Sequence, residues 1–274
     1  MTPDGHIDSA PGMVFGAAAT LYDAGRPGYS DALVTTVLAY ASLGGRAALE
    51  IGAGTGKATV AFAAHGLPLL CIEPDPRMAE VLRQNTAEYP DINIEVCGFE
   101  DWEPSQRRFG LVFAATSWHW LAPDRRWDLV HDVLEADGAV ALFWNLHGVV
   151  DAQLHADLAA LDERHDVVDS PHSKLARTYG DDAGEWGQGG GWPEAECLRD
   201  GRFTDLRSIR FHQDLHYDTD RYVAFLSSFS TYRILPETRR SQALADVAAL
   251  LDTRGTGIDM HHVADLFLAR RQAR

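Results

Sequence analysis

A glycine-rich segment near residue 50 has the sequence Ala48-Leu49-Glu50-Ile51-Gly52-Ala53-Gly54-Thr55-Gly56-Lys57. An apolar run leads into it, three glycines alternate through it, and the helix-forming run 58–64 follows it. Glycine tolerates the positive φ of a tight turn and lets a ligand approach bare backbone. A helix that starts there presents unpaired N–H groups and a partial positive charge. We interpret the segment as a cofactor-binding loop between a strand and a helix.

The spacing of the glycines excludes two well-known loops. A P-loop has the pattern Gly-x-x-x-x-Gly-Lys-Ser/Thr, which would require glycine at Ile51 and a hydroxyl at Ala58. The dinucleotide fingerprint Gly-x-Gly-x-x-Gly would require its third glycine at Lys57. The pattern present, Glu-x-Gly-x-Gly-x-Gly, resembles the first motif of class I S-adenosylmethionine-dependent methyltransferases. In that family the loop carries the amino-acid end of the cofactor.

An acidic residue follows the next expected strand. Residues 67–72 have the pattern of a short buried strand, and Glu73 stands at its end, 21 residues after Gly52. A carboxylate at this place can accept hydrogen bonds from both ribose hydroxyls of an adenosine cofactor, whether nicotinamide or methionine derived. Asp75 and Pro76 then predict an N-cap and a first helical turn. Glu73 therefore supports an adenosine ligand without choosing between the two cofactors.

Three further segments resemble motifs of the same family. An alternating strand at 92–96 precedes Cys97-Gly98-Phe99-Glu100-Asp101-Trp102, which is similar to the segment that meets the adenine ring and its amine. The strand 109–115 ends in Thr116-Ser117-Trp118-His119-Trp120, similar to the corresponding segment of small-molecule methyltransferases of the trans-aconitate type. Upstream, Tyr22-Asp23-Ala24-Gly25-Arg26-Pro27-Gly28-Tyr29 resembles the lead-in that folds over the cofactor in that subfamily. These motifs over residues 22–145 identify the chain as a class I methyltransferase that uses S-adenosylmethionine.

The resemblance implies two sets of site residues. The expected cofactor-binding residues are Tyr22, Arg26, Glu50, Gly52, Ala53, Gly54, Gly56, Glu73, Pro74, Met78, Phe99, Glu100, Ala115 and Thr116. The expected pocket for the methyl acceptor contains Tyr29, Trp118, His119, Trp120, Trp186 and Trp192. Among these, His119 is the candidate catalytic residue, because a pKa near 6.5 suits proton removal from a hydroxyl or amine. The alternative is that His119 hydrogen-bonds backbone and only shapes the pocket.

No metal site is expected. His212 and His216 lie four residues apart on one expected strand, and His261-His262 begins or precedes another. A metal would need a third donor, and the sequence supplies none at a recognisable spacing. These histidines are better explained as core or surface residues.

Composition limits the class of partner. The chain has 274 residues, 46% of them hydrophobic, which suits one domain over 1–274 with an insertion at 146–200. Its formal charge is 24 − 40 = −16, which disfavours nucleic-acid partners because phosphate binding needs basic surface. The three cysteines have no framework spacing, and neither a signal peptide nor a membrane-spanning run is evident. We expect a cytoplasmic monomer or homodimer that binds neither membrane nor nucleic acid.

The remaining pattern predicts an α/β fold with a doubly wound, seven-stranded, mainly parallel sheet, the Rossmann-like methyltransferase fold, with an antiparallel final strand. The expected helices are a first one to about Ala41, one from Pro123 to Gly138, and two near 219–229 and 236–253. Strands are expected at 139–144, 206–217 and 258–268. The insertion at 146–200 holds one amphipathic helix and a Gly/Trp-rich loop, and a loop of this length is usually a lid or binding element.

The motifs favour methyl transfer to oxygen, nitrogen or carbon of a small molecule, with secondary metabolism as one setting. The alternative is a methyltransferase-like protein that binds the cofactor for a regulatory or non-methylating role, since a fold alone does not identify chemistry. A nicotinamide oxidoreductase is disfavoured by Lys57 at the place of the third fingerprint glycine.

Overall fold

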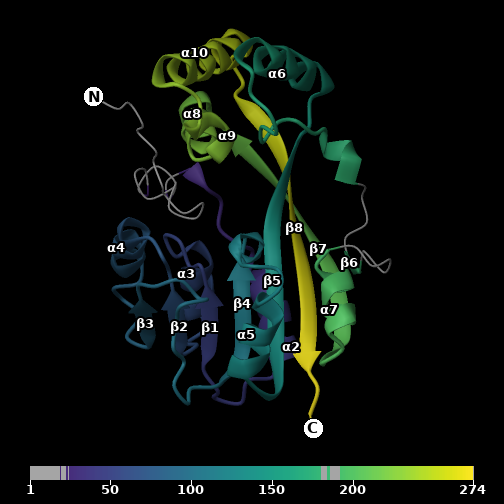
Figure 1. Ribbon diagram of the computed structural model, residues 1–274. Coiled ribbons are helices and arrows are strands. Elements are labelled where there is room, and N and C mark those ends of the chain that lie inside the picture. Colours follow the sequence, from purple (N-terminus) through teal and green to yellow (C-terminus); the bar gives the residue numbers. More distant parts are fainter. Residues whose placement is uncertain (1–18, 20–22, 24, 180–183, 186–191, 274) are drawn as a thin grey trace, which may run out of the picture.

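The structure is a computed structural model, which describes residues 19, 23, 25–179, 184–185 and 192–273. It contains one mixed sheet with the strand order β3-β2-β1-β4-β5-β8-β7-β6 (Figure 1). Its strands are β1 (Ala48–Ile51), β2 (Leu69–Ile72), β3 (Ile92–Glu95), β4 (Phe109–Ala115), β5 (Leu134–Val149), β6 (Gly184–Glu185), β7 (Phe203–Tyr217) and β8 (Ile258–Arg271). The helices are α2 (Asp31–Ala41), α3 (Lys57–Ala63), α4 (Pro76–Asn85), α5 (Arg126–Val133), α6 (Ala152–His165), α7 (Glu194–Asp200), α8 (Thr219–Ser227), α9 (Ser230–Arg233) and α10 (Glu237–Arg254), with short 3₁₀ turns η3 (Trp118–Trp120) and η4 (Ala176–Tyr179).

The sheet confirms the predicted fold class. Strands β3, β2, β1, β4 and β5 pair in parallel, and β8 runs antiparallel between β5 and β7. The two-residue β6 adds an eighth strand at the edge of β7, which the sequence did not predict. Parallel strands place their carboxyl ends, and the loops that follow them, along one edge of the sheet.

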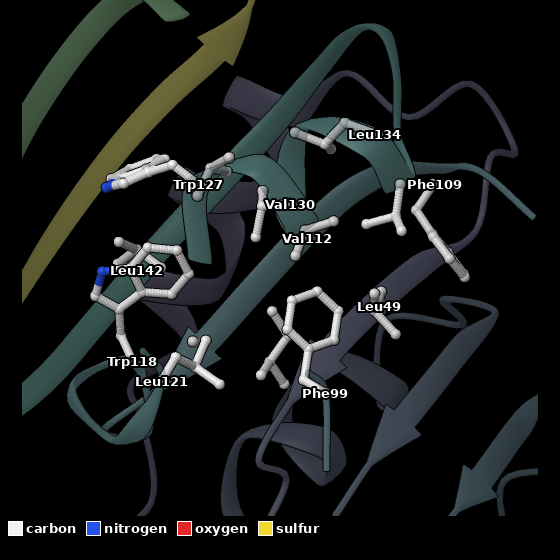
Figure 2. Close-up of a cluster of buried hydrophobic side chains, with 14 of the residues drawn as sticks. Leu49, Phe99, Phe109, Val112, Trp118, Leu121, Trp127, Val130, Leu134 and Leu142 are labelled. Atoms are coloured by element: carbon white, nitrogen blue, oxygen red, sulfur yellow. The ribbon is translucent and has the colours of Figure 1, made fainter. Parts of the chain in front are cut away.

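Two layers of helix cover the parallel part of the sheet. On one face α2 and α3 bury Val37 and Phe62 against Phe113 and Phe143 of the strands. On the other face α5 packs Trp127 and its neighbours, and Figure 2 shows this cluster of buried side chains. Covering both faces is what requires the nearly continuous apolar runs of β1, β2 and β4.

Beyond the end of β4, the long strands β5, β7 and β8 continue into a helical layer that we call the cap, formed by α6, α8, α9 and α10 (Figure 1). The cap has its own apolar core, in which Leu158 of α6, Phe225 of α8 and Leu251 of α10 are fully buried. Val149 and Met260, at the ends of β5 and β8, belong to the same core. The cap is therefore joined to the sheet by continuous strands.

Several predicted boundaries are wrong. The helix expected to end at Gly138 ends at Val133, because Leu134 already pairs with Phe109 of β4 as the first residue of β5. The helix expected from Pro123 begins at Arg126, because the amides of Arg125 and Arg126 turn back onto the carbonyl of Ala122. The strand expected at 139–144 extends over β5, because β8 pairs with it continuously up to Val149. No helix among the described residues is long and apolar enough to cross a membrane.

The segment 146–200, expected to cover the site, is divided in the structure. Its helix α6 lies in the cap beside α10. Its helix α7 packs instead on the lower part of the sheet, where Cys197 is fully buried beside Phe203. The role of this segment as a cover stays a prediction.

Candidate functional site

The three alternating glycines form the turn between β1 and α3. Gly52, Gly54 and Gly56 all have positive φ, at 67°, 60° and 92°. A Cβ on Gly52 would lie 2.6 Å from Cβ of Ser117, and one on Gly56 would lie 2.6 Å from Leu82. The same atom on Gly54 would meet only the terminal methyl of Met78, at 3.6 Å. The outer glycines are thus required by protein packing, whereas the middle one leaves space above the loop.

Glu73 connects this loop to the next helix. Its Oε2 accepts a hydrogen bond from the backbone N–H of Gly54 at 2.8 Å, and its Oε1 accepts one from Asp75 at 2.8 Å. Burial raises the pKa of Glu73 to about 6, although these two hydrogen bonds oppose that shift. Asp75 caps α4 by accepting from the N–H of Arg77, as predicted. A buried carboxylate therefore lies against the tip of the glycine loop.

Glu50 supports the loop from below. It is 1% exposed, and Thr59 of α3 donates a hydrogen bond to its Oε2 at 2.6 Å. Burial raises the pKa of Glu50 to about 8, partly opposed by the hydrogen bonds of Thr59 and Cys71. Among the described residues, Thr59 and Cys71 contact this carboxylate. Its expected contact with the cofactor stays a prediction.

Two hydroxyl groups hold the end of β4 beside the glycine loop. Ser117 donates a hydrogen bond to the carbonyl of Ile51, the last residue of β1. Thr116, with φ of 58°, places its hydroxyl 3.1 Å from the hydroxyl of Tyr29. The lead-in and the segment after β4 therefore meet where the cofactor site was predicted.

The aromatic cluster after β4 divides between core and surface. Trp118 is 1% exposed, and its ring centroid lies 5.0 Å from that of Trp127, edge to face. Figure 2 shows both side chains in the buried cluster. This burial leaves Trp118 little surface for an acceptor, because its ring faces the core beneath η3. His119 and Trp120 are exposed, with ring centroids 4.7 Å apart. Partial burial, followed by the Arg126 guanidinium, lowers the pKa of His119, which keeps it neutral and able to accept a proton.

Phe99 and Glu100 also contribute mainly to local structure. The ring of Phe99 is buried and stacks on Trp102 at 6.1 Å. The Oε1 of Glu100 accepts a hydrogen bond from the backbone N–H of Ala122 at 2.7 Å. This bond ties the segment after β3 to the segment after β4, so the two loops bordering the site are held together.

The lead-in bridges the glycine loop and the cap. Lys57 Nζ lies 3.3 Å from Oδ1 of Asp23. The guanidinium of Arg26 donates to the hydroxyl of Ser228 at 2.9 Å and lies 3.4 Å above the ring of Phe229. The structure thus directs Arg26 toward the cap, although the sequence predicted a cofactor contact.

The other predicted residues have varied positions. Tyr22 and Trp186 lie outside the described residues. Trp192 is 42% exposed, and its ring centroid lies 5.2 Å from that of Trp144. Pro74 is exposed, while Ala53 and Met78 are buried and Ala115 is half-buried at the end of β4. The part of the chain that the structure describes contains no group of three or more potential metal ligands.

Sequence reasoning missed several partners in this region. Thr59 and Ser228 contact the predicted residues Glu50 and Arg26. Asp23 and Ser117 contact Lys57 and Ile51, which border the glycine loop. Only the hydroxyl-rich context of Ser117, directly after a buried strand, was a local signal for such a role. The rest depend on which elements become neighbours in the fold.

Comparison with known proteins agrees with this geometry. Residues 48–138 match the protein family described as methyltransferase domain. An uncharacterized methyltransferase of Mycobacterium tuberculosis is 34% identical over 133 residues, which are 48% of this chain and 52% of that protein. A probable S-adenosylmethionine-dependent methyltransferase of Saccharomyces cerevisiae is 28% identical over 127 residues, which are 45% of this chain and 43% of that protein. The chain thus spans about half the length of the curated relatives that it matches.

Solved structures support the fold alone. A protein from Anaeromyxobacter dehalogenans, described as a candidate type II methyltransferase, aligns with a TM-score of 0.57 at 17% identity, over 91% of this chain and 99% of that one. The YcgJ protein of Bacillus subtilis aligns with a TM-score of 0.52 at 15% identity, over 89% of this chain and 100% of that one.

Proposed function

We propose that this chain, whose residues 48–138 match the methyltransferase domain family, is a class I methyltransferase that transfers a methyl group from S-adenosylmethionine to a small-molecule acceptor. Its relatives support the cofactor, since one of them is described as S-adenosylmethionine-dependent. The trans-aconitate type, the setting in secondary metabolism and the location in the cytoplasm belong to the same proposal. The three described cysteines are all free thiols, which suits a reducing compartment.

The observation that carries the proposal is the contact between Glu73 and Gly54. Glu73 Oε2 lies 2.8 Å from the Gly54 amide nitrogen. The carboxylate proposed to bind the ribose hydroxyls is therefore next to the glycine loop proposed to bind the amino-acid end of the cofactor. An adenosine cofactor that extends along this loop would contact both at once. Buried carboxylates are good acceptors for the hydroxyl pair of a ribose, since charge-assisted hydrogen bonds are the stronger ones.

The residues present fit such a cofactor. Gly54 leaves open space above the loop, where any side chain would take the room of a ligand. Thr55, between Gly54 and Gly56, has a buried hydroxyl oxygen without a hydrogen-bond partner among the described residues. A buried hydroxyl without a partner is costly, so it favours a ligand or water that supplies one.

S-adenosylmethionine supplies a methyl group on a positively charged sulfur, and methyl transfer to an acceptor lone pair leaves the former carbon–sulfur electron pair on sulfur. The chain then has three tasks. Glu73 and the glycine loop hold the donor, and Tyr29 with Thr116 closes the site beside β4, which aligns the reactants and limits water. Where the methyl acceptor is a hydroxyl or amine, the neutral ring of His119 takes up the proton that the acceptor loses.

Calorimetry tests the proposed cofactor site. The unmodified protein should bind S-adenosylhomocysteine and not NAD. Glu73→Ala should weaken that binding by about 1–3 kcal/mol, the scale for losing a charge-assisted hydrogen bond. Glu80→Ala is the matched control, because Glu80 is a 61% exposed glutamate on α4. Unchanged affinity in Glu73→Ala would contradict the site.

The chemistry needs a separate measurement. Cofactor with a labelled methyl group is incubated with the protein and a cell extract, which is then divided into small molecules, protein and nucleic acid. Label in the small-molecule fraction supports the enzyme. Tight binding without label in any fraction would support the alternative, a cofactor-binding protein with a regulatory or non-methylating role.

A further inference from the structure

An arginine is buried next to η3, the turn that carries His119. Arg126 is the first residue of α5, and its side chain is only 3% exposed. Arginine is rarely buried to this extent unless its charge is paired and its N–H groups are hydrogen-bonded. The partners of the guanidinium therefore indicate what this side chain does inside the fold.

The first partner is η3 itself. Nη1 of Arg126 donates a hydrogen bond to the carbonyl oxygen of Trp118 at 3.1 Å. Trp118 is the first residue of η3 and directly precedes His119. The central carbon of the guanidinium also lies over the ring of Trp118, 5.2 Å from its centroid. Because Arg126 contacts both the backbone and the ring of Trp118, it fixes the turn from which the side chain of His119 extends.

The second partner is Glu196 of α7, 70 residues further along the chain. Nη2 of Arg126 lies 2.5 Å from Oε1 of Glu196, and Nε lies 3.1 Å from Oε2. The indole N–H of Trp127 donates to the same Oε2 at 3.2 Å. A pair held at two points is strong and specific in its geometry, and arginine is the side chain suited to it. Glu196 therefore holds the guanidinium in one orientation.

Trp192, four residues before Glu196, extends the same contact toward the end of the sheet. The guanidinium carbon lies 5.6 Å from the centroid of its ring. That ring lies 5.2 Å from the ring of Trp144, which directly follows Phe143, the last residue of β5 to pair with β4. Arg126 thus joins the turn after β4 to the segment 192–200.

The charge of Arg126 also acts on His119. Burial is the larger cause that lowers the pKa of His119, and the Arg126 guanidinium is the other. Among the described residues, no other charged group is recorded as shifting this pKa. A nearby cation disfavours the protonated ring. The ring is therefore held neutral, which is the form that accepts a proton.

We propose that Arg126 is a positioning residue for methyl transfer: it holds η3, and with it the ring of His119, while Glu196 of α7 holds the guanidinium in place. The inference rests on the proposed function, in which His119 takes up the proton of the methyl acceptor. It adds that the segment 192–200 supports this ring through an ion pair, which is a role other than covering the site.

Two measurements follow His119. The first is the rate of label transfer from S-adenosylmethionine, labelled in the methyl group, to the small-molecule fraction of a cell extract, at a limiting amount of that fraction and over a range of pH. In the unmodified protein this rate should fall on the acid side, as the ring of His119 takes up a proton. The second is the pKa of His119 from an NMR titration of its ring, assigned by comparison with His119→Gln, which needs no methyl acceptor.

Two substitutions separate the shape of Arg126 from its charge. Arg126→Lys keeps the charge but loses the planar fork that joins Trp118 to Glu196. Its rate should fall about 10²-fold, the scale for a misplaced reacting group, with the pKa of His119 near that of the unmodified protein. Arg126→Met should lose as much rate, and the pKa of His119 should rise because the cation that opposed protonation is gone. Both variants should bind S-adenosylhomocysteine as the unmodified protein does.

A double variant and a control account for effects on folding. Arg126→Met leaves the carboxylate of Glu196 without its partner, which lowers stability. Arg126→Met combined with Glu196→Gln removes both charges, so it should fold and still show the raised pKa of His119. Arg125→Met is the matched control, because Arg125 is the exposed neighbour of Arg126 in the chain. It removes the same charge and should change neither the rate nor the pKa of His119.

Two results would overturn the inference. One is an unchanged pKa of His119 in the folded double variant, and the other is an Arg126→Lys variant with the rate of the unmodified protein. Failure of the proposed function looks different, because the unmodified protein would then transfer no label to any fraction. In that case the positioning role of Arg126 would be refuted together with methyl transfer.

Discussion

At Gly54, the middle glycine of the loop, the effect of a side chain on ligand binding can be separated from its effect on stability. Gly54 and Gly44 have nearly the same φ, 60° and 57°, and no protein atom lies within 3.5 Å of a Cβ at either place. We expect Gly54→Val and Gly44→Val to lose a similar stability, about 1–2 kcal/mol for a left-handed backbone. Only Gly54→Val should abolish binding of S-adenosylhomocysteine in calorimetry. Equal binding by both variants would mean that the loop does not hold the donor.

Glu50 gives the protein a pH-dependent stability. Its pKa is about 8 in the folded state against an ordinary value of 4.5, so the folded protein keeps a proton that the unfolded chain releases. Stability from this group is full below pH 4.5 and is lost as the pH rises toward 8. In urea unfolding, the free energy of unfolding of Glu50→Gln relative to that of the unmodified protein should rise across this range, by up to about 1.4 kcal/mol per pH unit.

The control for this series is Glu80→Gln, an exposed carboxylate on α4. The difference in the free energy of unfolding between Glu80→Gln and the unmodified protein should not change with pH. A flat difference for Glu50→Gln as well would show that Glu50 is not buried as a protonated acid.

The role of His119 is tested by the rate of methyl transfer. The ring is exposed and follows β4 by four residues, and its centroid lies 4.7 Å from that of Trp120. We expect His119→Gln to lower the rate of methyl transfer about 10²–10⁴-fold with unchanged affinity for the cofactor, as for the loss of a general base. A change confined to the KM for the acceptor would make His119 a pocket wall.

Between elements, the cap depends on one buried polar cluster. His172, fully buried, bonds Tyr222 of α8 at 2.8 Å through Nδ1 and Asp162 of α6 at 3.0 Å through Nε2. Tyr222→Phe would leave Nδ1 without its partner in an apolar core. We expect a loss of about 1–3 kcal/mol in the free energy of unfolding, measured in urea. Tyr89→Phe is the control, since no hydrogen bond of its hydroxyl is recorded among the described residues and its side chain is half-buried.

The same cluster explains why the cap is a unit. His172 connects Asp162 of α6 with Tyr222 of α8 by hydrogen bonds, which fix orientation more strictly than apolar contacts do.

For the whole molecule, donor binding should appear as thermal stabilisation. A ligand at a hundred times its Kd stabilises the folded state by about 2.7 kcal/mol. For a domain of this size that corresponds to a rise in Tm of roughly 5–10 °C. S-adenosylhomocysteine should give this shift in a thermal unfolding scan, and NAD at the same concentration should give none. An equal shift with NAD would contradict the choice of cofactor.

The sequence by itself determined the parts of this protein that are local in the chain. The positive φ values of Gly52, Gly54 and Gly56, the cap at Asp75 and the acidic residue after β2 follow from residue type and spacing within a few turns of chain. Apolar runs determined the parallel strands, since a strand buried on both faces has no alternation to read. These features predicted a strand, a tight glycine turn and a helix in this order, and the structure has all three there.

Only the tertiary structure decided which of the predicted residues face the site. Trp118 is in the core and Arg26 meets the cap, because the side on which a residue emerges depends on its neighbours across the fold. The extension of β5 past the end of β4 had no local signal in the sequence. Strand length and register are set by pairing with β8, more than a hundred residues away, and no short pattern in the sequence encodes that pairing.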